Sequence, residues 1–183
     1  MNRIISFTLV VVTLLFSACA GNNEYRKKPE AKFRLFKEKA FILPDNMVAQ
    51  NCDEQMPPDT ALLHRPLKMV VYVNQGGCQD CRLRTLLPIY MFMLENQHRE
   101  NFGVIIILNT SDMEDANNTL TEMRFHRTVF YDLDGSFERL NPHLPTDEQY
   151  HTFLLNEKNK VVLVGRPVYN EKLKKRYLAE LDK

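Results

Sequence analysis

The clearest hydrophobic patterns in this sequence are two short apolar runs, at 67–73 and 102–108. Both are rich in β-branched residues and both end at polar or turn-forming positions, which is typical of buried strands. Between them, from 78 to about 98, apolar residues recur at spacings of three and four, and this predicts a helix with one buried face. Pro88 lies inside the stretch and is expected to bend the helix. The two strands should therefore lie parallel, joined by a right-handed crossover.

The same alternation continues towards the C-terminus. A helix capped by Ser111 or Asp112 is expected to run to about Met123, and 128–131 predicts a further short strand. The segments 152–155 and 160–164, separated by a polar turn, predict a β-hairpin. A basic amphipathic helix should close the chain at 170–181. Strands that alternate with helices in this way indicate an α/β fold.

The region before residue 67 has weaker patterns. Residues 33–43 alternate loosely between apolar and charged side chains and are expected to add an edge strand. Residues 45–58 are rich in proline and asparagine, so they are expected to form a surface loop.

The first 18 residues have the pattern of an export signal. A short positive start is followed by an apolar run at 4–16, which is shorter than the roughly 20 residues that span a bilayer as a helix and suits a secretory signal. The sequence Phe16-Ser17-Ala18-Cys19 resembles the lipobox of bacterial lipoproteins, in which the cysteine thiol is joined to diacylglycerol and the chain is cut before it. The alternative is an ordinary cleaved signal peptide. Residues 19–32 are polar and are expected to form a tether.

This resemblance predicts a lipid-anchored protein of the bacterial cell envelope. Ala20 follows Cys19 where an aspartate would resemble the inner-membrane retention signal, so the outer membrane is favoured. The chain has 24 Lys and Arg against 23 Asp and Glu, a net charge of +1, and Arg3 is the one charge in the signal. A neutral mature protein is a poor nucleic-acid binder, and its membrane attachment would come from lipid.

The candidate chemistry lies in Cys78-Gln79-Asp80-Cys81. Two cysteines three positions apart follow a buried strand and open a helix, whose N-terminal N–H groups and partial positive charge stabilise a thiolate. Cys78, at the outer position, can attack a disulfide, and Cys81 can then resolve the mixed disulfide. A structural disulfide in an oxidising compartment is the main alternative. Zinc would need two more ligands, but Cys52 and the five histidines are scattered singly, so no metal site is expected.

The order of strands and helices around this CxxC motif resembles the thioredoxin fold. The segment from His151 to Val162 is similar to the family's Pro-Thr-x-Phe-Leu-Ile-Asp-x-x-Gly-x-Val, and the strand at 128–131 resembles the central insertion of membrane-tethered, thioredoxin-like periplasmic proteins. The whole chain resembles thioredoxin-like lipoproteins of the Bacteroides type. The resemblance implies a three-layer α/β sandwich with a central mixed sheet and an N-terminal extension, over 33–183 with its core at about 67–181. It also implies a Cys78–Cys81 disulfide.

Three features depart from the family pattern. Gly77 stands where the family usually has an aromatic residue, and Gln79-Asp80 replaces the usual Gly-Pro or similar dipeptide. The Asp80 carboxylate should raise the pKa of a nearby thiolate, an effect that Arg82 and Arg84 partly offset. The helix proline, Pro88, falls seven positions after Cys81 rather than about five.

The third departure is His151, which occupies the position of the family's cis-proline. A cis peptide before a non-proline residue costs about 3–4 kcal/mol, so a trans bond is expected here. An imidazole facing Cys78 would stabilise its thiolate or shuttle its proton. The alternative is a half-exposed histidine at the strand end with no role. Cys52 has no evident partner and is expected to be buried and inert, with a free thiol, an intermolecular partner or a relay member as alternatives.

Two functions remain in competition. The first is a membrane-anchored thiol–disulfide oxidoreductase that acts on exported proteins, needs no diffusible cofactor and is reset by an unidentified redox partner. The second is a non-catalytic envelope lipoprotein that uses the same scaffold as a binding or assembly module with a structural disulfide. Peroxide reduction is less favoured, because the Pro-x-x-x-Thr-x-x-Cys pattern of peroxiredoxins is absent from 71–78.

Overall fold

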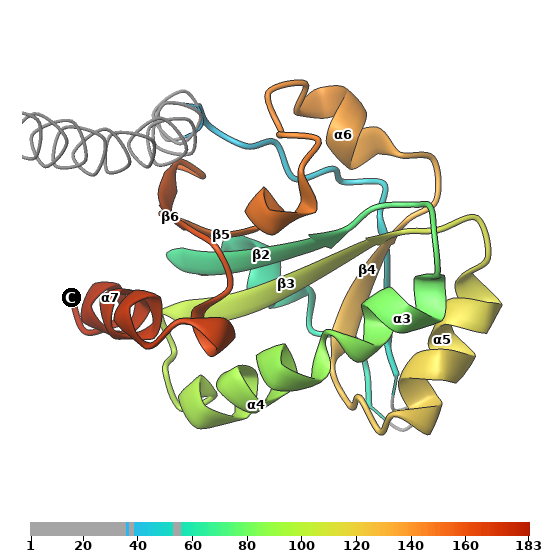
Figure 1. Ribbon diagram of the computed structural model, residues 1–183, viewed down its shortest axis with the longest axis horizontal. Coiled ribbons are helices and arrows are strands. Elements are labelled where there is room, and N and C mark those ends of the chain that lie inside the picture. The colour runs from blue at the N-terminus through green and yellow to red at the C-terminus, as the bar shows by residue number, and fades with distance from the viewer. Residues whose placement is uncertain (1–35, 37–38, 53–55) are drawn as a thin grey trace, which may run out of the picture. The chain divides into compact units, whose positions relative to one another are not determined.

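The computed structural model describes residue 36 and residues 39–52 and 56–183. These residues form one mixed six-stranded sheet and the helices that cover it (Figure 1). The predicted signal peptide, Cys19 and the tether lie outside these residues. The strand order is β1-β4-β3-β2-β5-β6. The strands are β1 (Val48–Asn51), β2 (Leu67–Val73), β3 (Phe102–Asn109), β4 (Thr128–Asp132), β5 (Thr152–Leu155) and β6 (Val161–Val164).

The centre of the sheet is parallel and its edges are antiparallel. β2 pairs with β3, and β3 with β4, in parallel, whereas β1, β5 and β6 add antiparallel strands outside them. All but the first residue of β2 and all but the last of β3 are buried, as expected for strands covered on both faces. The predicted parallel pair and the C-terminal hairpin are confirmed.

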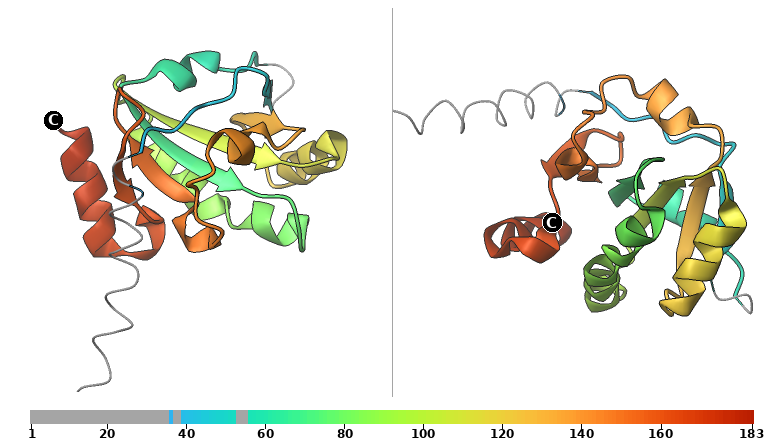
Figure 2. Two further views of the ribbon diagram at one scale, coloured as in Figure 1. Left: turned by 90° about the horizontal axis from the view of Figure 1, so that it is seen from above. Right: turned by 45° about the vertical axis from the view of Figure 1, so that its right-hand side comes forward.

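Four helices lie on one face of the sheet (Figures 1 and 2). They are α3 (Gln79–Arg84), α4 (Leu87–Asn96), α5 (Met113–Glu122) and α7 (Glu171–Leu181). Their apolar side chains form one core with the facing side chains of the sheet, for example Leu83, Leu120 and Tyr177. Asp112 caps α5 and Asn170 caps α7 through side-chain bonds to backbone N–H groups, and each cap stabilises its helix by about 1 kcal/mol. No described helix has the length and apolar composition that crossing a membrane requires.

The opposite face is covered by extended chain and short helices. A second apolar core, rich in phenylalanine, includes Phe36, Phe41 and Phe137. Asn141, which is fully buried, accepts a hydrogen bond from the Ile42 N–H (2.8 Å) and donates one to the Ile42 carbonyl (2.8 Å). The Asn141 side chain therefore pairs with the extended segment much as a neighbouring strand would. The short helices of this face include α6 (Ser136–Leu140) and η2 (Thr60–His64), and η3 (Glu148–Tyr150) precedes β5. The short helix η4 (Pro167–Tyr169) lies beside α4 and α7 and packs against the first core through Val168.

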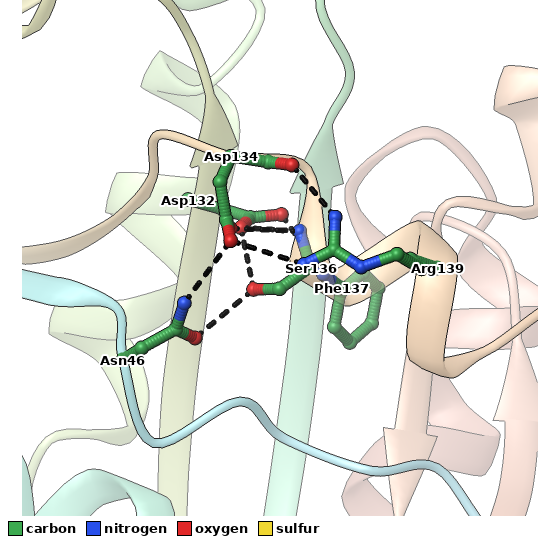
Figure 3. Close-up of polar contacts among 6 residues, drawn as sticks. All are labelled: Asn46, Asp132, Asp134, Ser136, Phe137 and Arg139. Carbon is green, nitrogen blue, oxygen red and sulfur yellow. Dashed lines mark hydrogen bonds and ion pairs between the residues drawn. The ribbon is translucent and has the colours of Figure 1, made fainter.

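Helix α6 begins on a buried carboxylate at the end of β4 (Figure 3). One Asp132 oxygen accepts bonds from the Ser136 N–H and hydroxyl, both at 2.8 Å, and the other accepts from the Phe137 N–H at 3.0 Å. The neighbouring Asp134 is exposed and pairs with Arg139 at 3.0 Å. The Asp132 carboxylate thus supplies the cap that Gly135, in the N-cap position with φ of 68°, has no side chain to provide.

Two predicted elements are wrong in detail. The edge strand is β1, inside the predicted loop, whereas the described part of 33–43 contributes a single bridge between Ala40 and Lys160. The expected helix at 78–98 is two helices, because α3 ends at Arg84 and Pro88 lies in the first turn of α4. A proline is favourable in a first turn, where its missing N–H has no intrahelical partner to lose. Helix α6 was not predicted.

Candidate functional site

The two cysteines of the CxxC motif lie at the C-terminal end of the parallel strands. β2 ends at Val73, a four-residue loop follows, and Cys78 is the N-cap residue of α3. Cys78 and Cys81 form a disulfide with an S–S distance of 2.05 Å and a Cα–Cα distance of 5.3 Å. In Figure 1 this is the start of the helix labelled α3, beside α5.

Both cysteines are exposed to solvent. A thiol or disulfide from another protein can therefore reach the bond from outside the fold. The Cys81 N–H donates to the Cys78 sulfur at 3.2 Å, and a hydrogen bond of this kind favours the charged form of the acceptor when the pair is reduced. The geometry thus distinguishes Cys78 as the sulfur with a backbone donor.

The glycine before Cys78 has a backbone reason. Gly77 has φ of +63°, a conformation that glycine adopts without the steric cost that other residues meet. A Cβ added at Gly77 would lie 3.4 Å from Nη2 of Arg82. The guanidinium of Arg82 therefore occupies the space beside Gly77.

The two residues between the cysteines make different contacts. The Gln79 side chain accepts a hydrogen bond from the Thr110 hydroxyl at 2.8 Å and donates to Asp115 on α5 at 3.5 Å, which ties α3 to the end of β3 and to α5. Asp80 is exposed and forms an ion pair with Arg84 at 3.0 Å. This ion pair raises the pKa of Arg84, and it gives the Asp80 carboxylate a partner other than the cysteines.

Arg82 connects the motif to two other segments. Its Nη1 donates to the Asn74 backbone carbonyl at 2.7 Å and also to the Asn74 side chain. Its Nη2 pairs with Glu148 of η3 at 2.6 Å. The side chain of Arg82 is only 25% exposed, so this arginine is part of the frame around the disulfide.

His151 is buried, and neither sequence interpretation, an imidazole facing Cys78 or a half-exposed strand end, predicted this burial. The residue is 2% exposed, so the half-exposed strand end is wrong. Its Nε2 lies 2.8 Å from the Pro145 carbonyl, and its ring is 5.3 Å from the Tyr72 ring. The Nδ1 atom is buried without a hydrogen-bond partner. The peptide bonds of the described residues are all trans, as expected at this position.

Cys52 is buried and unpaired. Burial raises the pKa of its thiol to about 11, so it stays protonated and unreactive near neutral pH. This agrees with the prediction of an inert cysteine. In the part of the chain that the structure describes, no three His, Cys, Asp or Glu side chains form a group that could hold a metal ion.

The sequence did not reveal Glu148 or the burial of His151. Glu148 comes 66 residues after Arg82, and no local pattern connects the two residues before the fold is known. His151 precedes a buried strand, and this was the one available indication that its side chain could be covered.

Comparisons with known proteins place this geometry in a fold. No family model matches the sequence, and no curated protein matches it either. A putative thiol:disulfide interchange protein DsbE from Chlorobium tepidum has a similar structure, with a TM-score of 0.53 and 20% identity over 78% of this chain and 97% of that one. At this identity the likeness shows the fold alone.

Two other solved structures are more distant. The thioredoxin domain of a thiol-disulfide oxidoreductase from Bacteroides vulgatus has a TM-score of 0.46 and 13% identity, over 62% of this chain and 80% of that one. A mutant of the protein PrxQ from Xylella fastidiosa has a TM-score of 0.48 and 11% identity, over 78% of this chain and 97% of that one. The likeness to the Chlorobium tepidum protein and the strand order of the sheet show a thioredoxin-like fold, as the motif and the order of elements predicted.

Proposed function

We propose that this protein is a membrane-anchored thiol–disulfide oxidoreductase that acts on exported proteins. The observation that carries the proposal is the exposed Cys78–Cys81 disulfide at the start of α3, with the Cys81 N–H directed at the Cys78 sulfur. A disulfide with only a structural role has no need of this exposure. The thioredoxin-like fold supports the same chemistry, because it places the pair at an accessible edge.

The reaction is a sequence of two exchanges. In the reducing direction, the Cys78 thiolate attacks one sulfur of a substrate disulfide, forms a mixed disulfide and releases the other substrate sulfur as a thiolate. The Cys81 thiolate then attacks the Cys78 sulfur, which restores the internal disulfide and releases the second substrate thiolate. Two electrons pass to the substrate, and a redox partner returns them by the same exchange. The oxidising direction reverses these steps.

Two further residues are proposed as modulators of the pair. Asp80 contributes a negative charge between the cysteines, balanced by Arg84. His151 contributes a buried imidazole whose Nδ1 has no hydrogen-bond partner. Neither residue is proposed as a nucleophile.

The experiment is a redox titration of the full chain against glutathione buffers, combined with insulin reduction. We expect the wild-type pair to exchange with glutathione and to reduce insulin when dithiothreitol is supplied. The Cys78→Ser variant should lose nearly all of this activity, whereas Cys52→Ser, which alters a buried cysteine outside the pair, should retain it. A Cys78→Ser variant as active as wild type would contradict the proposal.

The second candidate function is a binding or assembly module with a structural disulfide. It is favoured by the buried His151 with a trans peptide bond where the family has a cis-proline, because this changes the surface beside the cysteines. In that case the wild-type disulfide would stay oxidised in glutathione buffers that reduce an ordinary exposed disulfide.

We also propose that Cys19 carries the lipid anchor, on the basis of the lipobox-like Phe16-Ser17-Ala18-Cys19. When the chain is expressed in bacteria with labelled palmitate, we expect label in the protein and the protein in the outer-membrane fraction. Cys19→Ser should abolish the label and release the protein, and Cys52→Ser should change neither. Membrane-bound, labelled Cys19→Ser protein would exclude this anchor.

A further inference from the structure

We propose that the Arg82–Glu148 ion pair sets how readily Cys78 forms its thiolate. Arg82 is the cation, held beside the CxxC loop by Asn74, and Glu148 partly neutralises its charge. This inference rests on the proposed function, since it describes the regulation of the same site. It assigns Arg82 and Glu148 as positioning residues.

The first step is the connection that Arg82 makes. One nitrogen holds both oxygens of Asn74, at the end of β2, and another holds the Glu148 carboxylate of η3. Arg82 itself belongs to α3. A single guanidinium therefore joins the segments before, within and opposite the motif.

The second step is the place of this charge relative to Cys78. The guanidinium lies beside Gly77, the residue before Cys78, because a Cβ built on Gly77 would be 3.4 Å from Nη2 of Arg82. A cation beside a thiolate favours the charged form. The nearby Asp80 and Arg84 neutralise each other in their own pair, and the carboxylate of Asp115 on α5 is bonded by Gln79.

The third step is the small cavity beside this ion pair. Arg82, Glu148 and His151 line a cavity of about 10 Å³ together with Tyr72 and Arg166, and this is about the space of one water molecule. His151, one of these lining residues, has a buried Nδ1 without a hydrogen-bond partner.

This arrangement predicts opposite effects from the two halves of the pair. Arg82→Gln removes the cation and should lower the thiolate-to-thiol ratio of Cys78, by about threefold to tenfold at a fixed pH. Glu148→Gln removes the neutralising carboxylate while Asn74 still holds the guanidinium, so it should raise the ratio. Arg82→Lys keeps the charge and should restore most of the loss.

The measurement is the pH dependence of iodoacetamide alkylation in reduced protein carrying Cys81→Ser, followed by mass spectrometry on the peptide that contains Cys78. Arg99→Gln is the matched control. Arg99 is also partly buried, at 20% exposure, and pairs with the exposed Asp182 at 2.7 Å, away from the cysteines. Its loss should leave Cys78 unchanged.

The outcomes separate charge from structure. Changes of opposite sign in the Cys78 thiolate-to-thiol ratio of Arg82→Gln and Glu148→Gln support the proposal. Changes of the same sign, or no larger than that of Arg99→Gln, overturn it. If Arg82→Gln does not fold, Glu148→Gln alone decides. An increased thiolate-to-thiol ratio then supports the proposal, and an unchanged or decreased ratio overturns it. Alkylation requires no turnover, so a wild-type pair that fails to exchange with glutathione refutes the proposed function and leaves this test standing.

Discussion

At the scale of single residues, the three cysteines within the described chain have two distinct environments. Cys78 and Cys81 lie at the surface, whereas Cys52 is 3% exposed in the core between the sheet and the helices. The sequence predicted this division, because the motif pair follows a strand and opens a helix while Cys52 stands alone. It did not predict that the Arg82 guanidinium lies beside Gly77, because that contact is seen only in the folded backbone.

The raised pKa of Cys52 leads to a pH-dependent stability. The folded protein keeps this thiol proton up to about pH 11, whereas the ordinary value is 9.0, so the unfolded chain loses the proton first. Deprotonation then stabilises the unfolded state, and the free energy of unfolding should fall by about 2 kcal/mol between pH 9 and 11.

Urea unfolding of wild type and Cys52→Ala across this pH range measures the effect. Burial also raises the pKa of Tyr72, Tyr131 and Tyr177, and the charge of Cys52 adds to the raised pKa of Tyr131. These phenols stay protonated in the folded state of both proteins across this pH range, so their contribution cancels. The difference in the free energy of unfolding between wild type and Cys52→Ala should therefore become smaller as the pH rises from 9 to 11. A constant difference would show that Cys52 does not contribute.

At the scale of elements, the helices on the cysteine side were largely predictable and the opposite face was not. The helix at 113–122 and the closing helix carry caps and apolar spacings that can be recognised locally. Helix α6 has five residues, too few for a period to emerge, and it depends on a carboxylate from β4. Strand β1 likewise exists because it pairs with β4, a contact far along the chain.

The dependence of α6 on Asp132 is testable. Asp132→Ala leaves the buried Phe137 N–H without its acceptor and removes two bonds from Ser136, whose N–H keeps only a 3.1 Å bond to Asp134. We expect the free energy of unfolding to fall by about 2–4 kcal/mol. Asp134→Ala removes the exposed carboxylate of the same turn and should leave the urea midpoint close to that of wild type. Equal losses of the free energy of unfolding in the two variants would contradict the larger contribution expected from the buried Asp132 carboxylate.

At the scale of the whole molecule, the fold followed from the sequence because strands β2 and β3 are continuous apolar runs separated by a helical pattern. The predicted parallel pairing and hairpin are present. The candidate site was only half predictable. Its cysteines are neighbours in the chain, whereas Glu148 and His151 reach the same region through the pairing of β5 with β2, which no spacing in the sequence encodes.

The surface position of the cystine has a consequence for how the domain responds to reduction. The bond joins residues three positions apart, and short loops gain the least from cross-linking. Neither sulfur fills space in either apolar core. Reduction and reoxidation of this bond should therefore leave the fold intact, so that the protein can cycle repeatedly between its oxidised and reduced states without unfolding.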